Sequence, residues 1–146
     1  MKYFMTIVAS GFLVSASFAL TLKEKKELKA ANDYIAGDEG YAKTAKEKCG
    51  VDFKTTIDEK MVGPFLKDNF SVGSSCGAGV EALADLCGKD EETKKAVVDK
   101  IKSVKCMLGE KEKASYKING SVLEMTIGAG APNLNYNLKE YLENNL

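Results

Sequence analysis

Four cysteines, spread over the middle of this 146-residue chain, limit what it can fold into. They are Cys49, Cys76, Cys87 and Cys106, and no two of them have the Cys-x-x-Cys spacing of a zinc or redox site. An even number of cysteines in a small exported domain is typical of a disulfide framework. We therefore predict two disulfides, with free or metal-binding thiols as the alternative.

Residues 1–19 have the pattern of a secretory signal peptide. Lys2 precedes an apolar run, and the small residues Ser17 and Ala19 occupy the third and first positions before a possible cut. The run is short for a membrane-spanning helix, which needs about 20 apolar residues. We predict cleavage after Ala19, a single globular exported domain over 20–146, and a periplasmic or secreted location without stable membrane insertion.

The composition argues against several kinds of function. Removal of Lys2 with the leader lowers the 21 basic residues to 20 against 21 acidic ones, which gives no strong field to attract nucleic acid. The chain has no arginine, the usual bidentate ligand for phosphate, and no histidine, the commonest general base and zinc ligand. We therefore predict no nucleic-acid partner, no cofactor, no metal site and no catalytic residue.

The apolar pattern of the N-terminal half predicts several short elements. Helical spacing indicates helices over 22–36 and 41–48, and alternation indicates a half-buried strand over 51–57. A further short helix is indicated over 61–66, although Pro64 would break a helix interior.

A clearer helix follows in the middle of the chain. Apolar residues from Cys76 to Cys87 recur at i, i+4, i+7, i+8 and i+11, which places them in one stripe. Ser74 or Ser75 can cap its start, and Gly88 can end it in a left-handed turn.

A second helix is predicted immediately afterwards. Asp90 can cap it, and Val97, Ile101, Val104 and Leu108 would form its buried stripe. Two helices joined by so short a turn are expected to pack antiparallel.

This helix pair restricts the disulfide pairing, because bridged Cα atoms must lie within about 7 Å. Cys76 and Cys87 would be about 16 Å apart on one helix, and roughly 20 Å of helix would separate Cys87 from Cys106. The pairs that remain are Cys76 with Cys106 and Cys49 with Cys87. Each bridge is expected to stabilise the fold by about 2–4 kcal/mol.

The C-terminal third changes to strands. Asn119-Gly120 predicts a hairpin with a two-residue type I′ turn, closed by Ile118 and Ser121. Tyr116 then lies opposite Leu123 on the apolar side of the hairpin.

We therefore predict the α+β class. A disulfide-stapled antiparallel helix hairpin and further helices, one of them around 138–142, are expected to pack on a small antiparallel β-sheet. The sheet would contain the hairpin and the 51–57 strand.

Two groups of polar residues were considered as sites. The first is Asn32, Asp33, Asp38 and Glu39; the second is Asp52, Asp58 and Asp85. The first group has oxygen ligands that suit Ca²⁺ but lacks the EF-hand spacing, so an acidic turn is favoured. Two carboxylates of the second group could act as acid and base in glycoside hydrolysis, although surface charges and helix caps are the simpler interpretation.

The function expected from these features is that of a non-catalytic, disulfide-stabilised exported protein, which binds a protein or a small molecule. The alternative is a secreted enzyme, either a carboxylate hydrolase or a thiol–disulfide catalyst. A thiol catalyst needs an exposed cysteine of low pKa. The positions of Cys76 and Cys87 in an apolar stripe argue against one.

Overall fold

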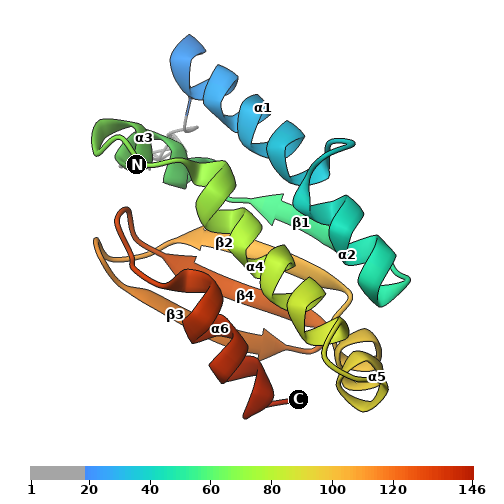
Figure 1. Ribbon diagram of the computed structural model, residues 1–146. Helices are drawn as coiled ribbons and strands as arrows, with labels where there is room; N and C mark the ends of the chain where they lie inside the picture. The colour runs from blue at the N-terminus through green and yellow to red at the C-terminus, as the bar shows by residue number, and fades with distance from the viewer. Residues whose placement is uncertain (1–18) are drawn as a thin grey trace, which may run out of the picture.

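The computed structural model describes residues 19–146, and its helices pack on a small β-sheet (Figure 1). The predicted leader, 1–19, therefore lies outside the described residues except for Ala19. The elements are α1 (Leu22–Ala36), α2 (Tyr41–Cys49), β1 (Lys54–Ile57), the 3₁₀ helix η1 (Glu59–Met61), α3 (Val62–Lys67), α4 (Val72–Cys87), α5 (Glu91–Lys100), β2 (Ser103–Leu108), β3 (Ala114–Asn119), β4 (Val122–Ile127) and α6 (Leu134–Glu143). The α+β class is confirmed.

The sheet has four strands in the order β1-β2-β4-β3. β1 and β2 are parallel, β2 and β4 are parallel, and only β3 and β4 are antiparallel. The prediction of a wholly antiparallel sheet is therefore wrong. The physical reason is connectivity, because α3, α4 and α5 form a crossover between β1 and β2 of the kind that parallel neighbours require.

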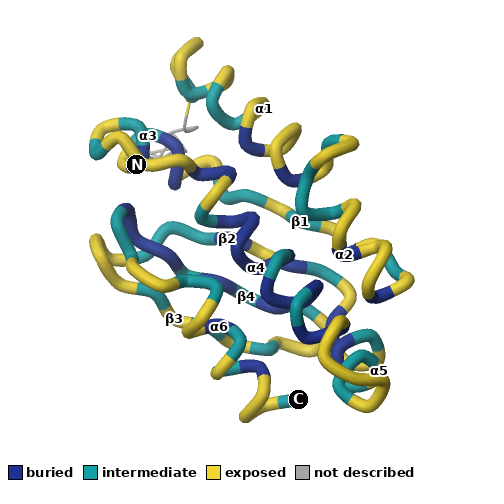
Figure 2. The backbone as a smooth tube through the Cα atoms, viewed as in Figure 1, coloured by how far each residue is buried: buried dark blue, intermediate teal, exposed yellow. Residues whose placement is uncertain are grey.

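One face of the sheet is covered by helices, and the strands alternate accordingly. Leu123, Met125 and Ile127 of β4 are fully buried beneath the helices. On the opposite face, Lys105 of β2 and Lys117 of β3 are exposed. The core therefore lies between the helical layer and one side of the sheet, as the tube coloured by burial shows (Figure 2).

The second predicted helix is only half correct. α5 begins after Asp90, whose side chain accepts a hydrogen bond from the Thr93 N–H at 2.7 Å, but it ends at Lys100. The segment that holds Val104 and Cys106 is strand β2, so a long antiparallel helix pair does not form. The turn before α5 also differs, because the C-cap of α4, Gly88, has φ −81° and is not left-handed.

The hairpin forms, but its register differs from the prediction by two residues. Asn119 lies opposite Val122, and Tyr116 lies opposite Met125. Gly120 has φ +61° at the first turn position, as a type II′ turn requires, whereas a type I′ turn needs a positive φ at both positions. A shift of two residues keeps each side chain on its predicted face, so Tyr116 still faces the helices.

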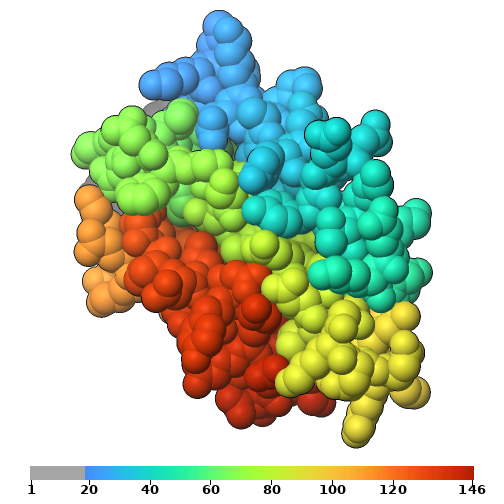
Figure 3. Space-filling model, viewed as in Figure 1, coloured from blue at the N-terminus to red at the C-terminus, as the bar shows by residue number. Residues whose placement is uncertain are grey.

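Helix α4 lies at the centre of the helical layer. On the face drawn in Figure 3 it is visible as a narrow band between α1 and α2 on one side and α6 on the other. Small residues allow this close packing, because a Cβ atom on Gly77 would lie 2.5 Å from the ring of Tyr41 and one on Gly79 would lie 2.3 Å from the Sδ atom of Met125. The helix begins earlier than predicted, since its N-cap is Ser71.

Both disulfides have the predicted connectivity. Cys49–Cys87 joins α2 to the end of α4, and Cys76–Cys106 joins the start of α4 to β2. The predicted position of Cys106 on a second helix is wrong, because Cys106 reaches Cys76 from strand β2 beneath α4 and not from α5.

Candidate functional site

The three aspartates considered as catalytic carboxylates do not form one site. Asp52 is exposed and forms an ion pair with Lys46 at 3.2 Å. The side chain of Asp58 caps η1 by accepting a hydrogen bond from the Lys60 N–H at 3.0 Å. Each of these carboxylates therefore has a structural partner of its own.

The third aspartate, Asp85, belongs to a polar network that holds α6 against α4. Its carboxylate lies 3.2 Å from the Lys139 Nζ atom and 3.6 Å from that of Lys48. The Asn135 side-chain amide of α6 donates to Glu81 at 3.0 Å and to Asp85 at 3.4 Å. Glu81 was not predicted as part of this network, although its position four residues before Asp85 puts both carboxylates on one helix face. Asp85 of α4 therefore contacts two ammonium groups, and these contacts link α4 to α2 and to α6.

The residues considered for Ca²⁺ are likewise used locally. Asp33 forms an ion pair with Lys29 at 2.5 Å, and the Asn32 side-chain amide donates to the Leu28 carbonyl at 2.9 Å. Between residues 19 and 146, no group of three or more His, Cys, Asp or Glu side chains is arranged to hold a metal ion. These local contacts account for Asp33 and Asn32, whereas Asp38 and Glu39 are exposed and form no ion pair within the described residues.

The cysteines offer no reactive thiol. All four are joined in disulfides, and each has 5% or less of its surface exposed. A thiol–disulfide catalyst attacks through an accessible thiolate. This part of the enzyme alternative therefore has no nucleophile in the folded protein.

A concave region lies between α1 and the segment around β1, and we call it the α1–β1 groove. It comprises two cavities of about 510 and 390 Å³, and Asn32 lines both of them. The first is lined by Ala19, Leu20, Lys25, Leu28, Lys29, Asn32 and Glu59; the second is lined by Asn32, Ile35, Ala36, Ala42, Asp52, Phe53, Lys54 and Thr55.

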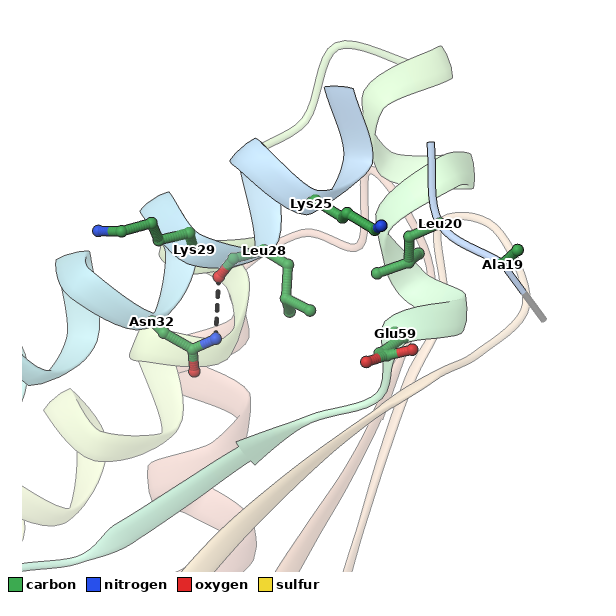
Figure 4. Close-up of a pocket in the computed structure, with 7 residues that line it drawn as sticks. All are labelled: Ala19, Leu20, Lys25, Leu28, Lys29, Asn32 and Glu59. Atoms are coloured by element: carbon green, nitrogen blue, oxygen red, sulfur yellow. Dashed lines mark hydrogen bonds between the residues drawn. The ribbon is translucent and has the colours of Figure 1, made fainter. Parts of the chain in front are cut away.

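Helix α1 and the segment around β1 supply the two walls of this groove. The side chains of Leu28 and Asn32 reach from α1 toward β1, and Leu20 points into the same space from the chain before α1 (Figure 4). The apolar pattern of 22–36 predicted a buried position for Leu28, but this side chain is half-buried at the groove wall. Its exposed part gives the groove an apolar surface.

The groove has more unpaired positive than negative charge. Lys29 and Asp52 line it but are paired with Asp33 and Lys46. Within the described part of the chain, the remaining charged groups of the lining form no ion pair within 4 Å. They are Lys25, Lys54 and Glu59, two cations and one anion.

One buried polar atom in the wall has no partner. The Thr55 Oγ1 atom is buried and makes no hydrogen bond within residues 19–146. Leaving a buried hydroxyl unsatisfied costs about 1–3 kcal/mol. Thr55 thus keeps a buried, unused hydroxyl group in the wall of the second cavity.

The two edges of the sheet are treated differently. At the β3 edge, the backbone N–H of Ile118 donates to the Tyr141 hydroxyl of α6 at 3.1 Å, and the Tyr116 hydroxyl donates to the Leu134 carbonyl at 3.4 Å. Helix α6 therefore covers this edge. At the other edge, β1 borders the groove.

The direction of the β1 backbone groups follows from one hydrogen bond. The Asp58 N–H donates to the Cys106 carbonyl of β2 at 2.9 Å. Backbone N–H and C=O groups alternate in direction along a strand, so those of Thr56, two residues earlier, point toward β2 as well. The intervening residues Thr55 and Ile57 then direct their N–H and C=O groups away from the sheet. Among residues 19–146, these outward N–H and C=O groups neither donate a backbone hydrogen bond to another element nor accept one from it.

Comparisons with protein-family models, with curated proteins and with solved structures find no match to this chain. Separately, no helix between residues 19 and 146 is both long and apolar enough to cross a bilayer.

Proposed function

We propose that this chain is a non-catalytic binding protein of an oxidising compartment, either the periplasm or the extracellular space. Its binding site is the α1–β1 groove without Ala19, which the proposed cleavage removes from the lining, and its partner is a protein or a small molecule. The observation that carries this proposal is the groove itself, which combines an apolar surface with unpaired charges.

Two observations support the location. Disulfides persist in oxidising compartments, and this protein has two of them with no cysteine left over. The leader pattern of residues 1–19 predicts export and a mature domain that begins at Leu20. Mass spectrometry of the exported protein should therefore find Leu20 as its first residue, and a retained Met1 would contradict the proposed processing.

The absence of catalysis is proposed from the state of the candidate groups. Asp52 and Asp85 are ion-paired, Asp58 caps a helix, and the thiols are oxidised. A hydrolase would instead require two carboxylates positioned on either side of one substrate bond.

Capture from the native cell envelope and culture medium tests this function. Ala36→Trp places a large ring in the groove, and Ala30→Trp places the same ring on an exposed part of α1 outside the lining. The wild type and Ala30→Trp should retain the same partner, identified by mass spectrometry, and Ala36→Trp should lose it. Equal recovery by all three proteins would place binding elsewhere and overturn the proposal.

A further inference from the structure

We infer that the occupant of the α1–β1 groove is an extended, acidic polypeptide segment, which pairs with β1 as a fifth strand of the sheet. This inference rests on the proposed function, because it takes the groove as the binding site. It adds the class of the partner and the way in which it is held.

The first argument is the unused backbone of β1. Thr55 and Ile57 direct N–H and C=O groups away from β2, and within residues 19–146 no other element bonds to them. An extended chain laid along this edge would satisfy these groups in the same way that a neighbouring strand does. The outward groups belong to Thr55 and Ile57, and an extended peptide backbone has donors and acceptors at the same two-residue spacing.

The second argument is the position of α1. An open strand edge by itself would pair with any extended chain, which is a risk of aggregation. Here α1 forms a second wall, and its Leu28 and Asn32 side chains reach toward β1 (Figure 4). A strand added to β1 would therefore have one face against these side chains, and alternate side chains of the ligand would occupy the two cavities.

The third argument is the contrast between the two edges. The β3 edge is covered by α6, with the Tyr141 hydroxyl accepting the Ile118 N–H. The β1 edge has no corresponding cover from the described part of the chain, and its residues Lys54 and Thr55 line the second cavity of the groove. The fold thus protects one edge with its own helix and presents the other to a partner.

Charge determines which peptide is preferred. Lys25 on the α1 side and Lys54 on the β1 side are unpaired, and Glu59 is the single unpaired anion of the lining. Complementary charge favours the correct partner and speeds its association. A segment with acidic side chains beside the pairing backbone is therefore preferred over a basic one.

The test uses the fact that proline removes a backbone N–H. Thr55→Pro deletes an outward N–H of β1 and leaves the hydrogen bonds to β2, which come from Thr56 and Asp58. Thr55→Val is the matched control, because it removes the same hydroxyl but keeps the N–H. Thermal denaturation would verify that both variants fold.

The probe is a library of random short peptides displayed on phage and selected against the disulfide-bonded mature protein. We expect selected peptides to be acidic and to bind Thr55→Pro about tenfold or more weakly than Thr55→Val. Synthetic versions of one selected peptide provide a second measurement that does not depend on the variant. Methylation of its backbone nitrogens at one set of alternate positions should abolish binding, and methylation at the other set should not.

Equal affinity of the peptides for Thr55→Pro and Thr55→Val, or equal tolerance of both methylation patterns, would overturn strand pairing. Failure to select any peptide that Ala36→Trp rejects would also overturn it. The proposed function is tested separately, because Ala36→Trp blocks any occupant of the groove. Partner capture lost with Ala36→Trp but unchanged with Thr55→Pro would leave the groove as the site and remove only the inference of an added strand.

Discussion

The Cα atoms of Cys76 and Cys106 lie 5.8 Å apart, so a disulfide connects the start of the central helix α4 directly to strand β2. The second disulfide connects the other end of α4 to α2, with 5.1 Å between the Cα atoms of Cys49 and Cys87. β2 is the neighbour of β1, and α2 contributes Ala42 to the α1–β1 groove. Both bridges therefore hold elements that position the walls of the proposed binding site.

Removal of the Cys76–Cys106 disulfide should weaken the fold strongly. Replacing Cys76 and Cys106 by alanine frees a loop of about 30 residues and should lower the free energy of unfolding by about 3–4 kcal/mol. Urea denaturation measures this loss, with the Cys49→Ala/Cys87→Ala pair as a control of similar loop length. A loss below about 1 kcal/mol would show that this link contributes little to the fold.

A glycine after β4 is required by a close approach of two backbone segments. A Cβ atom on Gly128 would lie 1.7 Å from the backbone oxygen of Glu110, so Gly128→Ala must displace the loop before β3. We expect it to cost more than about 2 kcal/mol of unfolding free energy. Gly50→Ala is the control, because Gly50 has φ +78° with no atom within 4 Å, and it should lose only the roughly 1–2 kcal/mol of left-handed strain. Equal losses would contradict the steric explanation.

The segment after α5 shows why part of the fold could not be predicted from sequence. Ile101, Val104 and Leu108 fit a helical stripe that continues from Val97, but Val104, Cys106 and Leu108 also fit the alternation of a strand. No glycine or proline separates the two patterns. The strand forms because β1 and β4 provide hydrogen-bonding neighbours on both sides, and these contacts are distant in the sequence.

Local signals, by contrast, were sufficient for several other elements. The helices predicted over 22–36 and 41–48 agree with α1 and α2. Pro64 does not prevent the third helix, because it lies in the first turn of α3, where its missing N–H would have no partner within the helix. These elements depend on neighbouring residues, which a single sequence displays directly.

The groove could not be identified in this way. Alternation in the 51–57 strand correctly places Thr55 on the inner side, and helical spacing puts Leu28 on the same stripe as Ile35. Nothing in either pattern indicates that β1 forms an edge of the sheet or that α1 lies beside it. That arrangement depends on the parallel pairing of β1 with β2 and on the long crossover between them.

The alkaline titration of Tyr41 should depend on Tyr34. The neighbouring hydroxyl of Tyr34, followed by burial, raises the pKa of Tyr41 to about 12 from an ordinary value of 10.0. The unfolded chain loses this proton near pH 10 and the folded chain near pH 12, so the stabilising contribution is complete below pH 10 and is lost as the pH rises toward 12. Tyr34→Phe should lower the pKa of Tyr41 toward 10.0, as NMR of ring-labelled tyrosine would show.

The matched control for this titration is Tyr136→Phe, which changes an exposed tyrosine on α6. It should leave the pKa of Tyr41 unchanged. If Tyr34→Phe also leaves it unchanged, the assignment of the shift to the Tyr34 hydroxyl is wrong.

The cover over the β3 edge should depend on a single hydroxyl group. The Tyr141 hydroxyl accepts the hydrogen bond from the Ile118 N–H at 3.1 Å, so Tyr141→Phe leaves that donor without its partner. We expect a loss of about 1–2 kcal/mol in unfolding free energy and faster hydrogen exchange at the Ile118 amide, while amides inside the β3–β4 pairing stay protected.

Tyr136→Phe removes a hydroxyl from the same helix without this contact and should change neither quantity. If Ile118 exchanges at the same rate in both variants, the edge is protected by the packing of α6 and not by this hydrogen bond. The contrast with the open backbone of β1 would then rest on the position of the helix alone.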